Sequence, residues 1–401
     1  MKVGFFVDRP PVYNGGYSQR IIREMNMVNG LDGVDSYLMA FVPSGEYVFS
    51  SGKIKDKLKA LPAEQVDIRH LVSSHIRIKR SLYDKFYAYI LKKWVQKKHI
   101  DVLICENLWC AYIGAMVSKE LGIKSVFDYH GIVPEESVYD NRCKIGDKDY
   151  NYLKSIEKYA INNSTNIICV SNRFKNYIID TFGVDKDKIS VVPCCVNDIP
   201  DTINFEKRKE IRASLGIERR KVIIYAGSIV KYQCVDEMIE IFSNLIKVDN
   251  SFYFLFLSAY NNYGSLKGKF AQYHIDESFY TMRSVKQDEV FNYLCASDFG
   301  FLIRDNNLLN KVSSPTKLAE YLMAGLPIVA TNSVGDINDI SSKVILCDYS
   351  NIKDDSFFNE IADFDTSLEN RTKNFSVAKK YLEDNLTWSS YEEVYKHIIM
   401  L

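Results

Sequence analysis

Short runs of consecutive apolar residues recur along the chain, and longer amphipathic stretches separate them. Each run is about four to eight residues long, which predicts a strand that is buried on both faces. The amphipathic stretches predict helices. The predicted strands lie at residues 3–7, 101–105, 125–128, 166–170, 189–193, 221–226, 252–257, 299–303 and 328–331, and predicted helices lie at 18–28, 206–215 and 235–247.

This alternation occurs twice, which predicts two α/β domains, each with a parallel sheet and helices on both faces. We expect a first Rossmann-like domain at residues 1–197 and a second one at 198–376. Residues 377–401 are expected to form a helical tail. A chain of 401 residues is long enough for two domains of ordinary size.

Composition narrows the class of protein. Hydrophobic residues make up 47% of the chain, enough for a sizeable core. Lys and Arg together number 51, as do Asp and Glu, which argues against a general nucleic-acid binder. No apolar run reaches the length of a membrane span, and the N-terminal run is too short for a signal peptide. The nine cysteines include no C-x-x-C pair, so we expect reduced thiols in a cytoplasmic protein and no metal site.

Residues 313–331 are predicted to form a loop, a helix that ends at Gly325 and Pro327, and a short buried strand. Ser314 is expected to cap the helix and Pro315 to be its first residue. Free N–H groups and the charge of Lys317 at that end predict a phosphate site. Glu320 shares a helix face with Lys317, and its carboxylate can accept two sugar hydroxyls. An ordinary capped helix with a surface salt bridge is the alternative.

Two glycines and a histidine follow predicted strands of the first domain, where open α/β sheets bind ligands. Gly15 and Gly16 form a turn after residues 3–7. The G-x-G-x-x-G fingerprint of dinucleotide sites is absent, and a simple tight turn is the alternative. His130 follows residues 125–128 and can donate or accept a hydrogen bond, although a lone histidine is more often structural.

Residues 76–99 carry eight Lys or Arg residues and a single acid, Asp84, with aromatic side chains between them. This composition predicts a basic amphipathic helix of the kind that lies on anionic membranes. We therefore expect the segment to dock the protein on a membrane that carries a lipid-linked acceptor. The alternative is a solvated helix whose aromatic residues pack into the core.

Several stretches, taken in order, resemble the motifs of GT-B glycosyltransferases, and more specifically those of the GT4-type retaining family. The strongest match is Pro315-Thr316-Lys317 with Glu320 and Gly325-Leu326-Pro327. Residues 304–310 resemble a branch of the family that acts in bacterial surface-polysaccharide synthesis. The other stretches are Asn14-Gly15-Gly16, Tyr129-His130-Gly131, the linker at 191–197 and Ala226-Gly227-Ser228.

The resemblance implies an α/β protein of the GT-B fold, with two Rossmann-like domains that face each other across a cleft and a C-terminal helix that crosses back to the first domain. It implies transfer of a sugar from a nucleotide-diphosphate sugar, with UDP or GDP as the nucleotide, to a glycan or lipid-linked acceptor. Retention of configuration and the absence of a metal, of other cofactors and of a nucleic-acid partner are also implied. The enzyme would act in cell-surface polysaccharide synthesis, in the cytoplasm at the inner face of the membrane.

The resemblance also implies roles for the matching residues. Lys317 and Lys231 would hold the diphosphate together with N–H groups from Ser314 to Thr316, and Arg304 would assist them. These groups would stabilise the charge that develops on the leaving diphosphate.

The remaining implied contacts concern the ribose and the sugar. Glu320 would accept the ribose hydroxyls, and His130 would contact the donor sugar near its reacting carbon. Front-face attack, with the leaving phosphate taking the acceptor proton, needs no protein base, so neither Glu135 nor Glu136 is assigned as one. Further donor contacts are expected from Gly15, Gly16, Gly227, Ser228, Asn310, Ser313, Ser314 and Thr316.

Three positions depart from the family pattern. An upstream glutamate is replaced by Val312, and an Arg/Lys pair by Ser228 and Gln233. These departures keep two alternatives open. One is a nucleotide-sugar epimerase or hydrolase on the same scaffold, and the other is a non-catalytic subunit that binds a nucleotide sugar.

Overall fold

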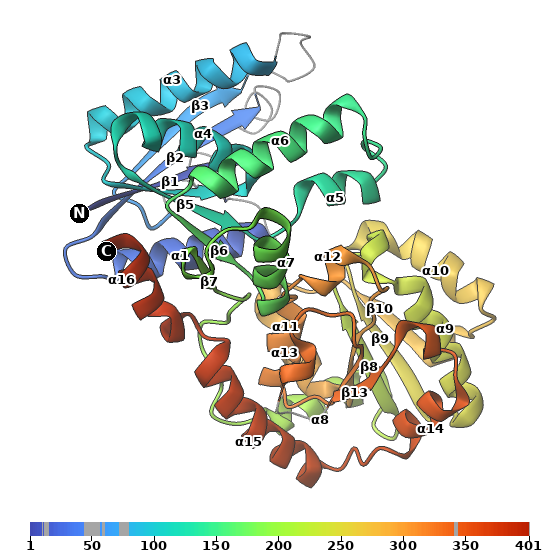
Figure 1. The fold of residues 1–401 in the computed structure, drawn as a ribbon. Coiled ribbons are helices and arrows are strands. Elements are labelled where there is room, and N and C mark those ends of the chain that lie inside the picture. Colours follow the sequence, from blue (N-terminus) through green and yellow to red (C-terminus); the bar gives the residue numbers. More distant parts are fainter. Residues whose placement is uncertain are drawn as a thin grey trace. The chain divides into compact units, whose positions relative to one another are not determined.

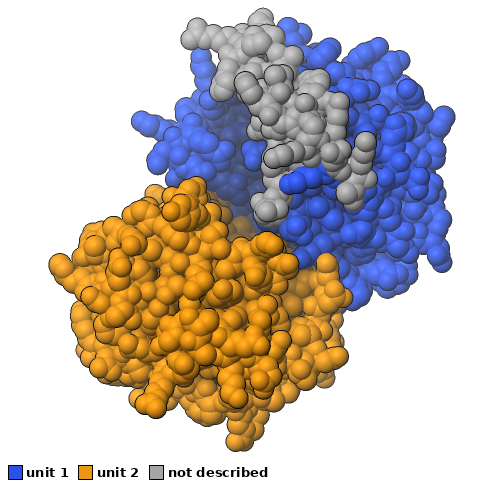
Figure 2. Space-filling model, turned by 180° about the vertical axis from the view of Figure 1, so that it is seen from behind, with its two compact units in different colours: residues 1–193, 388–401 blue, residues 194–387 orange. Residues whose placement is uncertain are grey.

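The computed structural model describes residues 1–9, 11, 16–43, 57, 61–71, 80–340 and 344–400. The chain forms two compact units, residues 1–193 with 388–401 and residues 194–387 (Figure 2). The boundary between the units lies after Pro193, whereas we expected it after residue 197. The chain returns to the first unit at Trp388 rather than at residue 377.

The strands that the structure describes in the first unit form one parallel sheet of seven strands (Figure 1). The strand order is β3-β2-β1-β4-β5-β6-β7. It reverses between β1 and β4, because Phe5 of β1 pairs with Leu38 on one side and with Ile104 on the other. Open α/β sheets bind ligands outside the carboxyl ends of the strands at such a reversal. The strands are β1 (Lys2–Val7), β2 (Asp35–Pro43), β3 (Gln65–Leu71), β4 (Val102–Glu106), β5 (Lys124–Tyr129), β6 (Asn166–Cys169) and β7 (Ile189–Val191).

Helices provide crossover connections between the parallel strands of the first unit. The last helix of the chain, α16, packs beside α1, where the Tyr395 hydroxyl donates to Glu24 Oε1 at 2.6 Å. The expected crossing of the C-terminal helix to the first domain is therefore confirmed for α16. The helices of this unit are α1 (Gly16–Asn29), α3 (Arg80–Lys98), α4 (Asn107–Leu121), α5 (Val133–Tyr139), α6 (Lys148–Asn163), α7 (Asn172–Phe182), η1 (Lys186–Lys188), η7 (Trp388–Tyr391) and α16 (Glu392–Met400).

The second unit repeats this architecture with a parallel sheet of six described strands in the order β10-β9-β8-β11-β12-β13. The order reverses between β8 and β11, because Gly300 of β11 pairs with Ile224 on one side and with Ile328 on the other. The carboxyl ends of β8 and β11 are therefore the expected ligand-binding edge of this sheet. The strands are β8 (Lys221–Ala226), β9 (Phe252–Leu257), β10 (Tyr280–Arg283), β11 (Phe299–Leu302), β12 (Ile328–Thr331) and β13 (Val344–Cys347).

The helix before the chain's return, α15 (Leu368–Asn385), belongs to the second unit. Its residues Ala378 and Leu382 are fully buried in the core of that unit, so the predicted tail at 377–401 is divided between the two units. None of the helices in the described ranges has the length and apolar character needed to span a bilayer. The other helices of the unit are α8 (Phe205–Leu215), η2 (Lys231–Gln233), α9 (Val235–Val248), η3 (Tyr260–Asn262), α10 (Tyr263–Gln272), η4 (Glu277–Phe279), α11 (Gln287–Ala296), α12 (Leu308–Lys311), α13 (Thr316–Met323), η5 (Ile337–Asp339), η6 (Tyr349–Asn351) and α14 (Asp355–Asp363).

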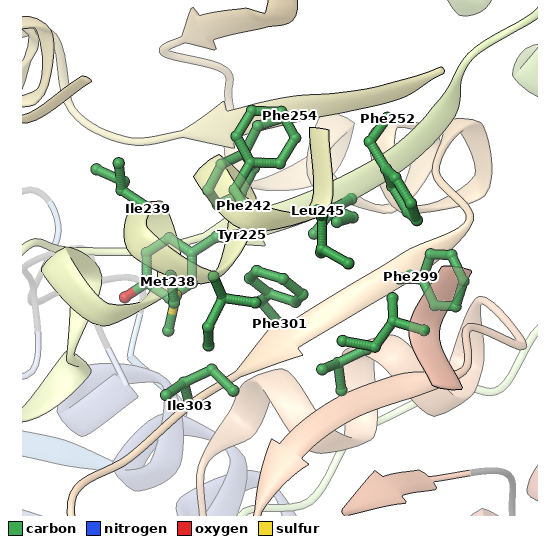
Figure 3. Packing of buried hydrophobic residues seen from close by; sticks show 14 of the residues in the cluster. Tyr225, Met238, Ile239, Phe242, Leu245, Phe252, Phe254, Phe299, Phe301 and Ile303 are labelled. Atoms are coloured by element: carbon green, nitrogen blue, oxygen red, sulfur yellow. The ribbon is translucent and has the colours of Figure 1, made fainter. Parts of the chain in front are cut away.

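Aromatic side chains fill the core on one side of the second sheet. Figure 3 shows Phe254 of β9 and Phe301 of β11, the two strands that flank β8, with Phe242 of α9. The ring centroid of Phe254 lies 5.7 Å from that of Phe301 and 5.2 Å from that of Phe242. Rings at these separations add favourable contacts to the burial of their surfaces, so the core holds the strands that carry the candidate site in place.

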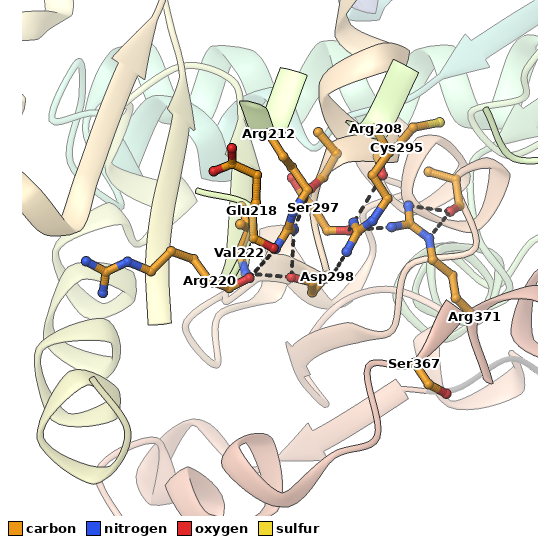
Figure 4. A network of polar contacts seen from close by, with 12 residues as sticks. Arg208, Arg212, Glu218, Arg220, Val222, Cys295, Ser297, Asp298, Ser367 and Arg371 are labelled. Atoms are coloured by element: carbon orange, nitrogen blue, oxygen red, sulfur yellow. Dashed lines mark hydrogen bonds and ion pairs between the residues drawn. The ribbon is translucent and has the colours of Figure 1, made fainter. Parts of the chain in front are cut away.

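Two arginines of α8 share the carboxylate of Asp298, and a third arginine, from α15, bonds backbone carbonyls nearby (Figure 4). Arg208 and Arg212 of α8 bond Asp298 at 2.5 and 3.1 Å. Arg371 of α15 donates to the backbone carbonyls of Ala324 and Leu294, at 2.8 and 3.0 Å from Nη2. The bond to Ala324 satisfies a carbonyl at the end of α13, and the bond to Leu294 adds a second donor to a carbonyl that also accepts the Ser297 N–H at the end of α11.

Candidate active site

The helix that carries Lys317 begins one residue later than predicted. Helix α13 starts at Thr316, and the capping position is Pro315 rather than Ser314. The prediction that Ser314 caps the helix is wrong, because its hydroxyl accepts the backbone N–H of Cys194 at 3.0 Å. Pro315 has no N–H group, so the open N–H groups of the first turn are those of Thr316 and Lys317.

The Lys317 side chain crosses the end of β8. Its Nζ lies 3.2 Å from Gln233 Oε1 and 5.1 Å from the centre of the Tyr225 ring. A Cβ atom at Gly227 would lie 2.7 Å from Lys317 Cε and 2.8 Å from Nζ. Glycine at 227 is therefore required for Lys317 to reach this position, and the two predicted site residues depend on each other.

Burial and the neighbouring charge of Arg304 lower the pKa of the Lys317 ammonium group to about 7, and Glu320 opposes this only in part. Its ordinary value is 10.5. The charge of the protonated side chain is thus compensated only in part, by Glu320. An anion bound beside Nζ would raise the pKa again, because a nearby opposite charge favours the charged form.

Arg304 follows β11 and is almost fully buried, with 2% of its surface exposed. Its guanidinium donates to the side-chain Oε1 of Gln233 at 2.5 Å and to the backbone carbonyl of the same residue at 3.1 Å. A third bond goes to the backbone carbonyl of Ile303. Among the residues that the structure describes, no carboxylate forms an ion pair with Arg304 or Lys317. Two basic side chains therefore meet at one edge of the sheet, and neither is in an ion pair with a described carboxylate.

Three further predicted donor residues lie near this edge. Ser228 is exposed, and its backbone carbonyl accepts the Tyr225 hydroxyl at 2.7 Å. Lys231 is exposed in η2, the same short turn that contains Gln233. Glu320 is half-buried on α13, one turn after Lys317. The structure thus brings these side chains to the end of β8 and the start of α13.

The loop between β11 and α13 is held by its own polar side chains. Asn310 is buried, and its Nδ2 donates to the Asp305 backbone carbonyl at 3.1 Å. The Ser313 hydroxyl donates to the Asn310 carbonyl at 2.8 Å. In this arrangement Asn310 and Ser313 shape the loop. Thr316, the first residue of α13, is half-buried beside it.

In the first unit, His130 lies directly after β5 beside two buried carboxylates. Its Nδ1 is 3.6 Å from Asp128 Oδ2 and 3.9 Å from Glu106 Oε2. Asp128 and Glu106 are fully buried, whereas 21% of the His130 side chain is exposed. The Tyr17 ring of α1 lies 5.9 Å from the imidazole. His130 therefore presents one edge of its ring to the carboxylates.

Arg20 of α1 completes this cluster. Its Nε and Nη2 donate to the two oxygens of Asp128 at 2.7 and 2.8 Å. Burial acts to raise the pKa of Asp128, but the charge of Arg20 outweighs it and lowers the pKa below its ordinary value. Burial, followed by the charge of Asp128, raises the pKa of Glu24 to about 7 and that of Glu106 well above its usual range. Asp128 is therefore the charged carboxylate of the cluster, and Glu106 holds a proton.

Sequence analysis did not identify Arg20, Glu106 and Asp128 as parts of the site. The available signal was an acidic residue at or near the carboxyl end of each of two neighbouring apolar strands, β4 and β5. Acidic side chains seldom end buried strands without a partner, and here the partners come from α1 and from the residue after β5.

Glu106, Asp128 and His130 are also the one group in the described ranges that has suitable geometry for a metal ion. Arg20 already bonds both oxygens of Asp128 and neutralises its charge. A divalent cation beside this guanidinium would be repelled. The donor set therefore fits a histidine held beside a charged carboxylate better than a metal site.

Of the predicted glycine turn, Gly15 and Asn14 lie outside the described residues. Gly16 is exposed as the first residue of α1, and a Cβ atom there would contact nothing within 4 Å. After His130, a Cβ atom at Gly131 would lie 2.2 Å from Glu136 Oε1, so the Glu136 carboxylate packs against this backbone.

Comparisons with known proteins agree with this architecture. Residues 49–198 match the model of Glycosyltransferase Family 4. A search of curated proteins finds no match to the chain. A glycosyltransferase from Rickettsia africae superposes with a TM-score of 0.70 at 16% identity, over 99% of this chain and 98% of that one.

Two further solved structures are similar. HepE (Alr3699) of Anabaena in complex with UDP-glucose gives a TM-score of 0.69 at 12% identity, over 100% of both chains. WaaG, a glycosyltransferase involved in lipopolysaccharide biosynthesis, gives 0.67 at 15% identity over 99% of both chains. The fold is therefore that of GT-B glycosyltransferases, and the match over residues 49–198 confirms the expected likeness to the GT4-type family.

Proposed function

We propose that the chain is a retaining glycosyltransferase that moves a sugar from a nucleotide-diphosphate sugar to a glycan or lipid-linked acceptor. The observation that carries this proposal is the meeting of Lys317, Arg304 and the open end of α13 at the ligand-binding edge of the second sheet. The UDP-glucose complex of HepE and the role of WaaG in lipopolysaccharide biosynthesis support a UDP or GDP donor and a cell-surface polysaccharide pathway at the cytoplasmic face of the membrane.

The chemistry depends on stabilising the diphosphate as it leaves the sugar. The Lys317 ammonium group would contact the phosphates directly. Buried Arg304 would add its positive potential, and the N–H groups of Thr316 and Lys317 would donate hydrogen bonds. Charges that are fixed before the reaction stabilise a developing anion without reorganisation. We therefore propose that no metal ion is required.

Residues around Lys317 would make the remaining contacts with the nucleotide sugar. Glu320 would accept the two ribose hydroxyls, and exposed Lys231 would approach the diphosphate from η2. Gly227 leaves space for Lys317, and Ser228 follows it at the end of β8. The loop from Asn310 to Ser314 would border the sugar, with main-chain groups available where its side chains bond within the loop.

On the first unit, His130 would contact the donor sugar. The charged Asp128 carboxylate beside Nδ1 favours the tautomer that carries the proton on that nitrogen. Nε2 then remains for the sugar. Attack on the same face as the leaving group would let the departing phosphate take the acceptor proton. No side chain would need to act as base, and Glu106 and Asp128 would position His130. Gly15 and Gly16 would allow close approach of the main chain to the phosphates or acceptor.

We also propose that α3 docks the protein on an anionic membrane. Leu82, Phe86 and Tyr89 are 55–58% exposed and follow one another at spacings of four and three, so they share a helix face. Lys85 and Lys93 are exposed on the same helix. Other aromatic residues of this helix fit the alternative, in which they pack into the core, as Tyr87 and Trp94 do. Apolar side chains with lysines around them fit a surface of anionic lipid headgroups.

The proposed function is tested by thermal-shift screening of the full chain against UDP-, GDP-, ADP- and CMP-sugars. A ligand that binds the native state raises the melting temperature by mass action. We expect a UDP- or GDP-sugar to do so, and product analysis with and without acceptor then identifies the reaction. Conversion of the donor alone would indicate an epimerase or hydrolase. Binding without turnover on any acceptor would indicate a non-catalytic subunit, and no binding at all would overturn the proposal.

A further inference from the structure

The carboxamide oxygen of Gln233 accepts hydrogen bonds from three side chains. They are Arg304 Nη2 at 2.5 Å, the Tyr225 hydroxyl at 2.8 Å and Lys317 Nζ at 3.2 Å. Arg304 carries a full positive charge, and Lys317 carries one when it is protonated. Gln233 itself is buried, with 6% of its surface exposed. A neutral oxygen with two lone pairs therefore lies where two cations converge.

A carboxylate at this place would be the ordinary partner of two buried cations, because buried charges are normally paired. Here Arg304 bonds only carbonyl oxygens, from Gln233 and Ile303. Its guanidinium also lies 5.9 Å from the centre of the Tyr232 ring, which carries no charge. The two positive charges are aligned by Gln233 but are not neutralised by it.

We infer that Gln233 is a positioning residue that holds Arg304 and Lys317 together and leaves their charge for an incoming diphosphate. The inference rests on the proposed function and names a residue that does not itself bind the donor. A neutral amide orders the two cations, because each donates to the same oxygen. Once Lys317 is protonated, the pair presents two positive charges, which match those of a diphosphate group.

The protonation of Lys317 depends on the charged groups around it. The groups that set its charge are Arg304, which repels a proton, and Glu320, which attracts one. When a diphosphate binds, Lys317 becomes fully protonated, so binding takes up a proton above pH 7. This uptake can be measured by calorimetry in buffers of different ionisation enthalpy.

The experiment compares the full-length wild type with Gln233→Glu, using pyrophosphate, UDP and GDP as probes. The new carboxylate would pair with both cations. We expect the melting temperature of the protein without ligand to rise by about 2–4 °C or more, because the buried cations of Arg304 and Lys317 would gain a carboxylate partner. We expect the affinity for pyrophosphate to fall by about tenfold or more, and proton uptake at pH 8 to disappear. Gln272→Glu, at the exposed end of α10, is the matched control and should change neither.

A second variant keeps the inference open to test if Gln233→Glu does not fold. Arg304→Met removes the repulsion on Lys317, so proton uptake at pH 8 should decrease and pyrophosphate should bind more weakly. A purely structural arginine would leave the uptake unchanged. If the wild type binds a probe and both affinity and uptake persist in Gln233→Glu, the inference is wrong and the proposed function stands. If the wild type binds none of the three probes, both fail.

Discussion

At the scale of single residues, the second unit prepares Lys317 for an anion. The absence of a Cβ atom at Gly227 gives its side chain room, and burial beside Arg304 lowers its pKa to about 7. A surface lysine of a capped helix, which was the alternative, would have neither property. The environment of Lys317 therefore supports the phosphate-binding interpretation over the ordinary surface salt bridge.

Lys317→Ala is expected to lower kcat/KM for the nucleotide sugar by about tenfold or more. A hydrogen bond to a charged group contributes about 1.5–3 kcal/mol, and this one would strengthen as the diphosphate leaves. Steady-state kinetics with the donor found by thermal shift measure the effect. Lys209→Ala, on the exposed face of α8, is the control. An unchanged kcat/KM in Lys317→Ala would remove this residue from the site.

At the scale of secondary-structure elements, the position of α8 depends on one carboxylate. Asp298 binds both Arg208 and Arg212 and accepts the backbone N–H of Val222 at 2.7 Å. Asp298→Asn would leave two largely buried guanidinium groups without a counter-charge. We expect a loss of about 3–5 kcal/mol in the free energy of unfolding of the second unit.

Urea denaturation, followed by far-UV circular dichroism, measures this loss in the free energy of unfolding. Asp201→Asn is a suitable control, because its carboxylate is almost fully exposed in its pair with Lys379. Equal stability of Asp298→Asn and the wild type would show that backbone carbonyls alone hold the arginines.

The exposed face of α3 is a second feature at this scale. Phe86→Ser combined with Tyr89→Ser should abolish flotation with vesicles that contain anionic lipid, because the helix loses the side chains that insert between headgroups. Wild-type protein should float at low salt and less at high salt. Tyr260→Ser, which alters an exposed tyrosine of the second unit, should float like the wild type. No flotation of the wild type at low salt would reject the membrane contact.

At the scale of the whole molecule, each unit places charged groups near the carboxyl ends of its own parallel strands. The first unit gathers Arg20, Asp128 and His130 there, and the second gathers Lys317 and Arg304. In the proposed mechanism Lys317 and Arg304 supply the positive charge that a metal would provide, so a chelator such as EDTA is expected to leave glycosyl transfer intact. Activity lost with chelator and restored by a divalent ion would contradict this, and substitution of Glu106 would then show whether the ion binds beside His130.

Much of the architecture could be predicted because buried parallel strands are apolar without interruption. The strands at 221–226, 252–257 and 328–331 have the bounds that the sequence predicts. Four of the described strands were not predicted. Three of them, β3, β10 and β13, are edge strands, which are less buried and have a mixed pattern. The fourth, β2, lies inside its sheet but begins with the polar residues Asp35 and Ser36.

The sequence by itself determined the two α/β halves, the helix that presents Lys317 and Glu320 on one face, and the glycine that precedes Ser228. These features are local, since helix periodicity and strand burial act over a few neighbouring residues. Only the tertiary structure decided that Arg304 donates a hydrogen bond to Gln233, which lies 71 positions away in the sequence. Lys317 donates to the same oxygen of Gln233. The tertiary structure likewise brought Arg20 to Asp128 across 108 positions. Such pairs depend on strand order and on the packing of helices against the sheet, which no short segment encodes.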